Sequence, residues 1–182
     1  MELIKTSNLY SLNKSTYVNL RWIAYLGQLS AILIVQFFLK YNFNYFICIS
    51  ILFFSILTNF YLQFRIKENQ LNNFISSVYL LFDIFQLGLL FFFTGGITNP
   101  FIFLIIIPAV FSSQYLSLNS SITLVLIIII VLCILSFYYI DLPHPNKFHF
   151  HVPNYYLYAV PISIIIGLVF LVYFGVKFGE ST

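Results

Sequence analysis

Long apolar runs separated by short polar segments make up most of the chain, and six of them approach the length of a bilayer crossing. A transmembrane helix needs about 20 consecutive apolar residues. Runs that are apolar on every side favour helices, because the strands of a membrane barrel are shorter and alternate with polar positions. The pattern therefore predicts an all-α integral membrane protein with six transmembrane helices. The expected spans are Leu20–Leu39, Phe43–Phe64, Phe74–Phe93, Phe101–Leu116, Ile122–Ile140 and Tyr155–Val176. The fourth is the shortest, and Pro108 and three polar residues interrupt it.

The composition supports the same class, since 61% of the residues are hydrophobic and only 7% are charged. The mean hydropathy of +0.97 is too high for a soluble domain of this size. Basic residues concentrate on the cytoplasmic side of membrane proteins, and six against two place both termini in the cytoplasm. The expected inner residues are Lys5, Lys14, Arg21, Arg65, Lys67 and Lys177, and the outer ones are Lys40 and Lys147.

The chain divides into three expected parts. Residues 1–19 form a polar cytoplasmic segment, short of stable structure or folded as a brief helix. Residues 20–177 form the six-span membrane domain, and residues 178–182 begin a cytoplasmic linker to an output domain that the printed sequence does not contain. No cluster of basic residues suggests nucleic-acid binding, so no nucleic-acid partner is expected.

The loop Thr94–Phe101, between the third and fourth spans, carries the clearest candidate chemistry. Asn99 is a favoured N-cap residue and Pro100 a favoured first helical residue, so together they are predicted to open the fourth span. Gly95 and Gly96 tolerate a positive φ and allow a ligand to approach the backbone closely. The alternative interpretation is a capped turn between two spans.

A quinone head group suits this loop, because it offers two carbonyl acceptors on a flat apolar ring and arrives through the bilayer. Thr94, Thr98 and Asn99 are candidate donors to the carbonyls, and Phe93 and Phe101 are candidates to flank the ring. One hydrogen bond contributes only about 1 kcal/mol net. Affinity is therefore expected to come mainly from membrane partitioning and burial of the ring.

The heptapeptide Gly95–Phe101 resembles the GGxxNPF motif of the RegB/PrrB/ActS family of redox-sensing histidine kinases. In that family the motif is associated with quinone binding in the outer loop between the third and fourth of six spans. Leu20–Gln28 is similar to the family's LRW…GQ opening of the first span, and Asp83–Leu87 is a weaker third match. The resemblance carries over the motif residues Gly95, Gly96, Asn99, Pro100 and Phe101, while Ile97 and Thr98 fall on variable positions.

The resemblance implies a sensor in the bacterial inner (plasma) membrane that reads the quinone pool through residues 95–101. The ligand is then ubiquinone or another membrane quinone, and the expected assembly is a homodimer embedded in lipid. In the family the signal passes to a cytoplasmic kinase module after the sixth span, and from there to a cognate response regulator. That module is absent from the printed sequence, so no catalytic residue is predicted and the enzyme class of the whole protein stays open.

Asp83 is the only acidic residue well inside a predicted span. One face of the third span carries Ser76, Tyr79, Asp83 and Gln86 at helical spacing. These residues predict either a polar seam between helices or, with Asp83 protonated, a coupling of quinone redox state to helix packing. Gln28 and Gln36 of the first span are candidate partners of the seam.

Cys48 and Cys133 both lie inside predicted spans and are expected to be buried, small apolar side chains. His144, His149 and His151 fall in the outer loop, where exposed histidines are expected and no metal site is predicted.

Two other function classes remain open. One is a six-span substrate-binding membrane protein, such as the binding subunit of a vitamin transporter. The other is a structural or assembly subunit in which residues 95–100 form only a turn. Binding of a quinone, of a water-soluble vitamin, or of neither separates the three.

Overall fold

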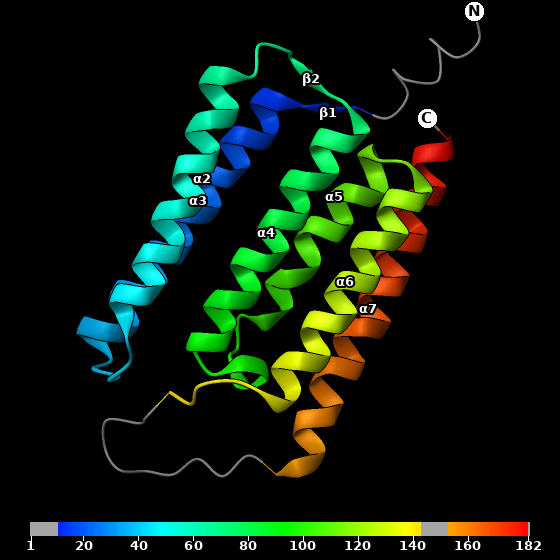
Figure 1. The fold of residues 1–182 in the computed structure, drawn as a ribbon. Helices are drawn as coiled ribbons and strands as arrows, with labels where there is room; N and C mark the ends of the chain where they lie inside the picture. Colours follow the sequence, from blue (N-terminus) through cyan, green and yellow to red (C-terminus); the bar gives the residue numbers. More distant parts are fainter. Residues whose placement is uncertain (1–10, 143–152, 182) are drawn as a thin grey trace, which may run out of the picture.

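The computed structural model describes residues 11–142 and 153–181, and these are almost entirely helical (Figure 1). The main helices are α2 (Lys14–Leu33), α3 (Tyr45–Arg65), α4 (Asn73–Phe93), α5 (Ile107–Tyr115), α6 (Leu118–Phe137) and α7 (Asn154–Ser181). The shorter elements are the strands β1 (Leu12–Asn13) and β2 (Gln70–Leu71), a π-helix over Ile34–Phe38, and 3-10 helices over Gly96–Thr98 and Ile102–Ile106.

An all-helical membrane architecture is confirmed, but the count of six spans is not. Among the described residues, five helices are long and apolar enough to cross a bilayer, and the predicted fourth span is the shorter apolar helix Ile102–Tyr115. That helix begins as a 3-10 turn and becomes α-helical at Ile107, with Pro108 in the first turn of α5. Proline has no N–H to donate and is tolerated in a first turn, so Pro108 lies where the α-helix begins.

The helical structure begins earlier than predicted. Asn13 caps α2 by accepting a hydrogen bond from the Thr16 N–H at 3.1 Å, and Leu12 pairs with Leu71 in the two-stranded sheet. Lys14 Nζ donates to the Ile66 carbonyl at 2.6 Å. Residues 14–19 are therefore the first turns of α2, neither an unstructured segment nor a separate brief helix, while residues 1–10 lie outside the described residues.

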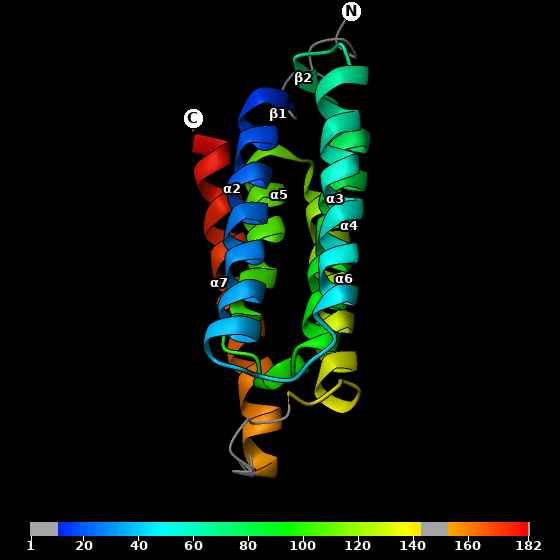
Figure 2. The same cartoon turned by 90° about the vertical axis from the view of Figure 1, so that its left-hand side faces the viewer.

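Helices α2 and α3 form a hairpin beside α4, and α5, α6 and α7 complete the bundle on the other side of α4 (Figures 1 and 2). Buried aliphatic side chains from α4 to α7 make the main core, including Ile84, Ala109 and Ile128. A smaller cluster of Ile32, Cys48 and Leu90 joins the hairpin to α4. The main core also includes Tyr17 and Val18 of α2 and Leu62 of α3, so it joins the hairpin to the rest of the bundle.

Strand β1 and the end of α7 lie at one end of the bundle, and the loop after α4 lies at the other (Figure 1). Which end faces the cytoplasm remains a prediction from the charge pattern. One residue must be removed from that pattern: Arg21, predicted as an inner surface cation, is only 4% exposed inside α2.

The two cysteines are both free but differ in environment. Cys48 is fully buried as predicted, whereas Cys133 lies exposed on α6, so the prediction of burial is wrong for Cys133. Helix α6 is apolar around its whole circumference. Its sequence therefore has no polar face from which the exposed side of the helix could be predicted. His144, His149 and His151 lie outside the described residues.

Candidate functional site

The two glycines of the loop are required by backbone geometry and packing. Gly95 has φ +100° and Gly96 has φ +55°, both in the left-handed region that glycine adopts most easily. The Gly95 N–H donates to the Ile140 carbonyl at 3.0 Å, and a Cβ at Gly96 would overlap the Tyr139 ring. Burial, and then the nearby Asp141 carboxylate, raise the pKa of the Tyr139 phenol above its ordinary value. The glycine pair therefore fits the loop against the chain that follows α6.

Asn99 closes the loop through its side chain. Its Nδ2 donates to the carbonyl and to Oγ1 of Thr94, both at 2.9 Å, and its Oδ1 accepts from the Phe101 N–H at 2.9 Å. The next helix has its N-cap at Phe101 and begins at Ile102. The prediction that Asn99 and Pro100 open this helix is therefore wrong by two residues, because Asn99 caps a preceding turn.

The hydroxyl groups of the loop are also engaged internally. Thr94 Oγ1 donates to the Leu90 carbonyl and Thr98 Oγ1 donates to the Gly95 carbonyl, each at 2.6 Å. Together with the bonds of Asn99, these contacts use the side-chain donors that the sequence offered for a ligand. The loop is thus held in one shape by its own polar groups.

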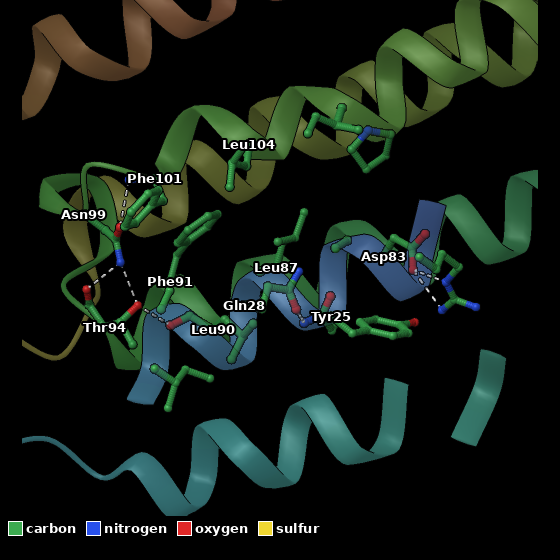
Figure 3. Close-up of a pocket in the computed structure, with 18 of the residues that line it drawn as sticks. Tyr25, Gln28, Asp83, Leu87, Leu90, Phe91, Thr94, Asn99, Phe101 and Leu104 are labelled. Atoms are coloured by element: carbon green, nitrogen blue, oxygen red, sulfur yellow. Dashed lines mark hydrogen bonds and ion pairs between the residues drawn. The ribbon is translucent and has the colours of Figure 1, made fainter. Parts of the chain in front are cut away.

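A cavity of about 400 Å³ extends from this loop along α2, α4 and α5 (Figure 3). Asn99, Phe101 and Thr94 form one end of it, while Gly95, Gly96, Thr98 and Pro100 do not line it. Phe93, predicted to flank a ligand ring, also lies outside the lining. Most of the wall is aliphatic or aromatic, including Leu87, Leu90, Phe91, Leu104, Ile107 and Phe111.

The cavity is incompletely closed between α2 and α5. Ala24 and Gly27 of α2 line it and are exposed, as are Phe101 and Ile107 across from them, at 48% and 46%. No atom other than its local backbone lies within 4 Å of the position that a Gly27 Cβ would take. The cavity is therefore open at the side of the bundle, beside Ala24 and Gly27.

The far end of the cavity holds a buried ion pair. Arg21 Nη2 of α2 lies 2.9 Å from the Asp83 carboxylate of α4, and these side chains are 4% and 15% exposed. The Tyr17 hydroxyl also donates to that carboxylate, and Arg21 Nη2 donates to Thr58 Oγ1 of α3 at 2.9 Å. Arg21 thereby joins three helices at one point.

Three tyrosine rings surround this guanidinium. The rings of Tyr17, Tyr25 and Tyr79 have centroids 5.5, 5.6 and 5.5 Å from the Arg21 carbon, within the range of cation–π attraction. The polar face predicted on the third span is therefore real, but its main partner is Arg21. Sequence analysis missed this because it began the helix at Leu20, which placed Arg21 at a membrane surface. The cap at Asn13 is the signal that would have moved it inside.

Between the two ends, Gln86 Nε2 of α4 donates to Gln28 Oε1 of α2 at 2.8 Å, and both residues line the cavity. Gln28 was a predicted partner of the polar seam, and this prediction is confirmed. Gln36 is not a partner: its Oε1 is buried and forms no hydrogen bond with any described residue.

Sequence comparison with known proteins supports the family that the loop motif suggested. The chain is 32% identical over 157 residues to the sensor histidine kinase RegB of Cereibacter sphaeroides, a match that covers 86% of this chain. The chain has a membrane region of the RegB family. The matched part is 34% of the length of that RegB, so the chain spans about a third of this curated relative. No family model matches the chain, and no solved structure matches it.

Within this RegB-family region, the motif residues divide by position. Asn99 and Phe101 line the cavity. The two glycines face the chain after α6 instead, since Gly95 bonds to the Ile140 carbonyl and Gly96 packs against Tyr139. A motif that reads as one heptapeptide in the sequence thus has a lining part and a supporting part.

Proposed function

We propose that this chain is the membrane sensor region of a histidine kinase and reads the redox state of the membrane quinone pool in the cavity described above. The observation that supports this most is the position of the motif: Asn99 and Phe101 close one end of an apolar cavity that opens sideways. A ligand that lives in the bilayer needs such a lateral entry.

The chemistry of the cavity suits a quinone head group. Ligand sites commonly have volumes of roughly 300–1,000 Å³ and apolar walls with a few polar groups, and this cavity holds about 400 Å³. The ring would pack against Phe101 and Leu104, and the isoprenoid tail would leave between α2 and α5. Most of the binding free energy then comes from burying the ring.

Occupancy would act on the packing of the hairpin α2–α3 against α4–α7, since the cavity lies between them. A ligand shifts such an equilibrium by its difference in affinity for the two arrangements. In this proposal the shift passes through α7 to a kinase module in a homodimer, and then to a response regulator. The vitamin-binding alternative is not favoured, because the cavity wall is mainly apolar.

Phe101→Ala tests this proposal. We expect the affinity for short-tailed ubiquinone to fall about tenfold, which corresponds to about 1.4 kcal/mol of lost ring contact. The measurement is competition of this ubiquinone against a photoactivatable quinone in lipid nanodiscs. Phe103→Ala is the matched control, because Phe103 is exposed on the 3-10 helix whose N-cap is Phe101 but does not line the cavity.

If Phe101→Ala and Phe103→Ala both bind like the unmodified chain, the quinone does not occupy this cavity. If the unmodified chain shows no saturable labelling, the quinone proposal fails as a whole.

A further inference from the structure

The middle of the cavity presents an amide pair whose hydrogen bonding is incomplete. Gln86 is only 4% exposed, yet it lines the cavity together with Gln28 on the facing helix. The bond from Gln86 Nε2 to Gln28 Oε1 is the hydrogen bond that these two side chains make within the described part of the chain.

Counting donors and acceptors shows what the pair leaves open. Each glutamine amide has two N–H donors and one carbonyl acceptor, and the mutual bond uses one N–H of Gln86 and the Oε1 of Gln28. The NH₂ group of Gln28, the second N–H of Gln86 and the Oε1 of Gln86 have no partner among the described residues. If the two amides exchange roles, the inventory is the same: one free NH₂ group, one further free N–H on the other amide, and one free carbonyl.

The polar groups at both ends of the cavity are occupied. Asn99 and Thr94 bond to the loop at one end, and Arg21 and Asp83 bond to each other at the opposite end. Open hydrogen-bonding capacity is therefore concentrated at the Gln28–Gln86 pair. An unpaired amide group in an apolar surrounding is unfavourable until something pairs with it.

We propose that Gln28 and Gln86 recognise the head group and its redox form. This rests on the proposed function. The free NH₂ group donates to a carbonyl oxygen of the oxidised quinone, and the free carbonyl accepts a hydrogen bond from a hydroxyl of the quinol. The two redox forms thus occupy one place with opposite hydrogen-bond polarity. Because Gln28 belongs to α2 and Gln86 to α4, either form links the hairpin to the rest of the bundle differently.

The test uses the double variant Gln28→Met/Gln86→Met, which keeps side-chain length and removes every amide group. The probes are short-tailed ubiquinone and an isosteric arene with methyl groups in place of the two carbonyl oxygens. We expect the unmodified chain to prefer the quinone about tenfold, and the double variant to lose that preference. Gln36→Met is the matched control, since Gln36 is a glutamine on the same long helical span but outside the cavity lining.

A spectroscopic reading separates recognition from a merely structural role. The carbonyl stretch of bound, isotope-labelled ubiquinone should lie at lower frequency in the unmodified chain and in Gln36→Met than in the double variant. If the double variant does not fold, the single variants Gln28→Met and Gln86→Met replace it, each with an intermediate preference because one amide remains.

Each outcome decides a different statement. An unchanged preference for the quinone in the double variant overturns the role of the amide pair and leaves the quinone site in place. Loss of the preference in the double variant, with the preference intact in Gln36→Met, supports the role of the amide pair. An unmodified chain that binds neither probe removes the proposed function itself.

Discussion

Gly96 is the loop residue with the least room for a side chain. Its φ is +55°, and the ring of Tyr139 occupies the space that a Cβ would need. The sequence motif predicted a glycine with freedom to approach a ligand closely. The structure shows a close approach to a side chain of the same molecule, a contact made by residues distant in the chain and therefore invisible in the local pattern.

Gly96→Ala should lower the free energy of unfolding by about 1–3 kcal/mol, because it overpacks the contact with Tyr139 and adds strain at a positive φ. The measurement is thermal unfolding in detergent micelles. Gly167→Ala is the control, since nothing lies within 4 Å of its Cβ position and its φ is ordinary.

The double variant Gly96→Ala/Tyr139→Ala isolates the packing part of this cost. The two changes should interact favourably, because removing the ring also removes the overlap. Strict additivity of the two single effects would count against the contact.

At the scale of elements, the sequence pattern predicted where helices occur but not how each one begins or which face it buries. The helix over 73–93 matches its predicted span closely, since its apolar run has clear polar flanks. The prediction of a regular helix for the fourth span is wrong, because a 3-10 segment precedes Pro108. The cavity was not predictable, since it arises between α2, α4 and α5, and no single-helix pattern shows a gap between helices.

Gly27 on α2 offers a test of this cavity at the element scale. Gly27→Leu should fill the open space from the helix that lines it and lower quinone affinity at least tenfold. Folding should be retained, because glycine is about 0.8–1.0 kcal/mol less favourable than alanine in a helix and leucine is close to alanine. The measurement is the same nanodisc competition, together with thermal unfolding.

Gly167→Leu in α7 is the matched control for this change. Gly167 also has open space around its Cβ position, but it does not line the cavity. Equal quinone affinity in the two leucine variants would show that the space beside Gly27 is not where the ligand binds.

At the scale of the whole molecule, the hairpin α2–α3 is attached to the bundle by two kinds of contact, apolar packing and a buried polar cluster. One is the small cluster of Ile32, Cys48 and Leu90, and another is the Arg21–Asp83 pair with its bond to Thr58. The sequence identified Asp83 as a candidate for coupling, but it offered only Gln28 and Gln36 as candidate partners of the polar seam. Only the packing of α2 against α4 shows that the carboxylate lies against a guanidinium.

Asp83→Asn should loosen the hairpin, because it leaves the Arg21 guanidinium buried without its counter-charge. Breaking a buried ion pair in this way costs about 3–5 kcal/mol. Cys48 reports separation of the hairpin from α4, since its thiol is fully buried against α4 in the closed bundle. The background variant Cys133→Ser removes the exposed thiol, so that only Cys48 can be labelled. In detergent micelles, a thiol-reactive fluorophore should label Cys48 at a lower temperature in Asp83→Asn.

Asp141→Asn supplies the control for this experiment, because Asp141 is an exposed carboxylate outside the helices. It should leave the labelling temperature of Cys48 unchanged. Added ubiquinone should raise that temperature in the unmodified chain, since a ligand that binds only the closed arrangement stabilises it by mass action. If Cys48 reacts at the same temperature in Asp83→Asn and Asp141→Asn, the ion pair does not hold the hairpin. Coupling between cavity and bundle would then have to run through the other contacts of the hairpin, such as Gln28–Gln86 and the Ile32, Cys48 and Leu90 cluster.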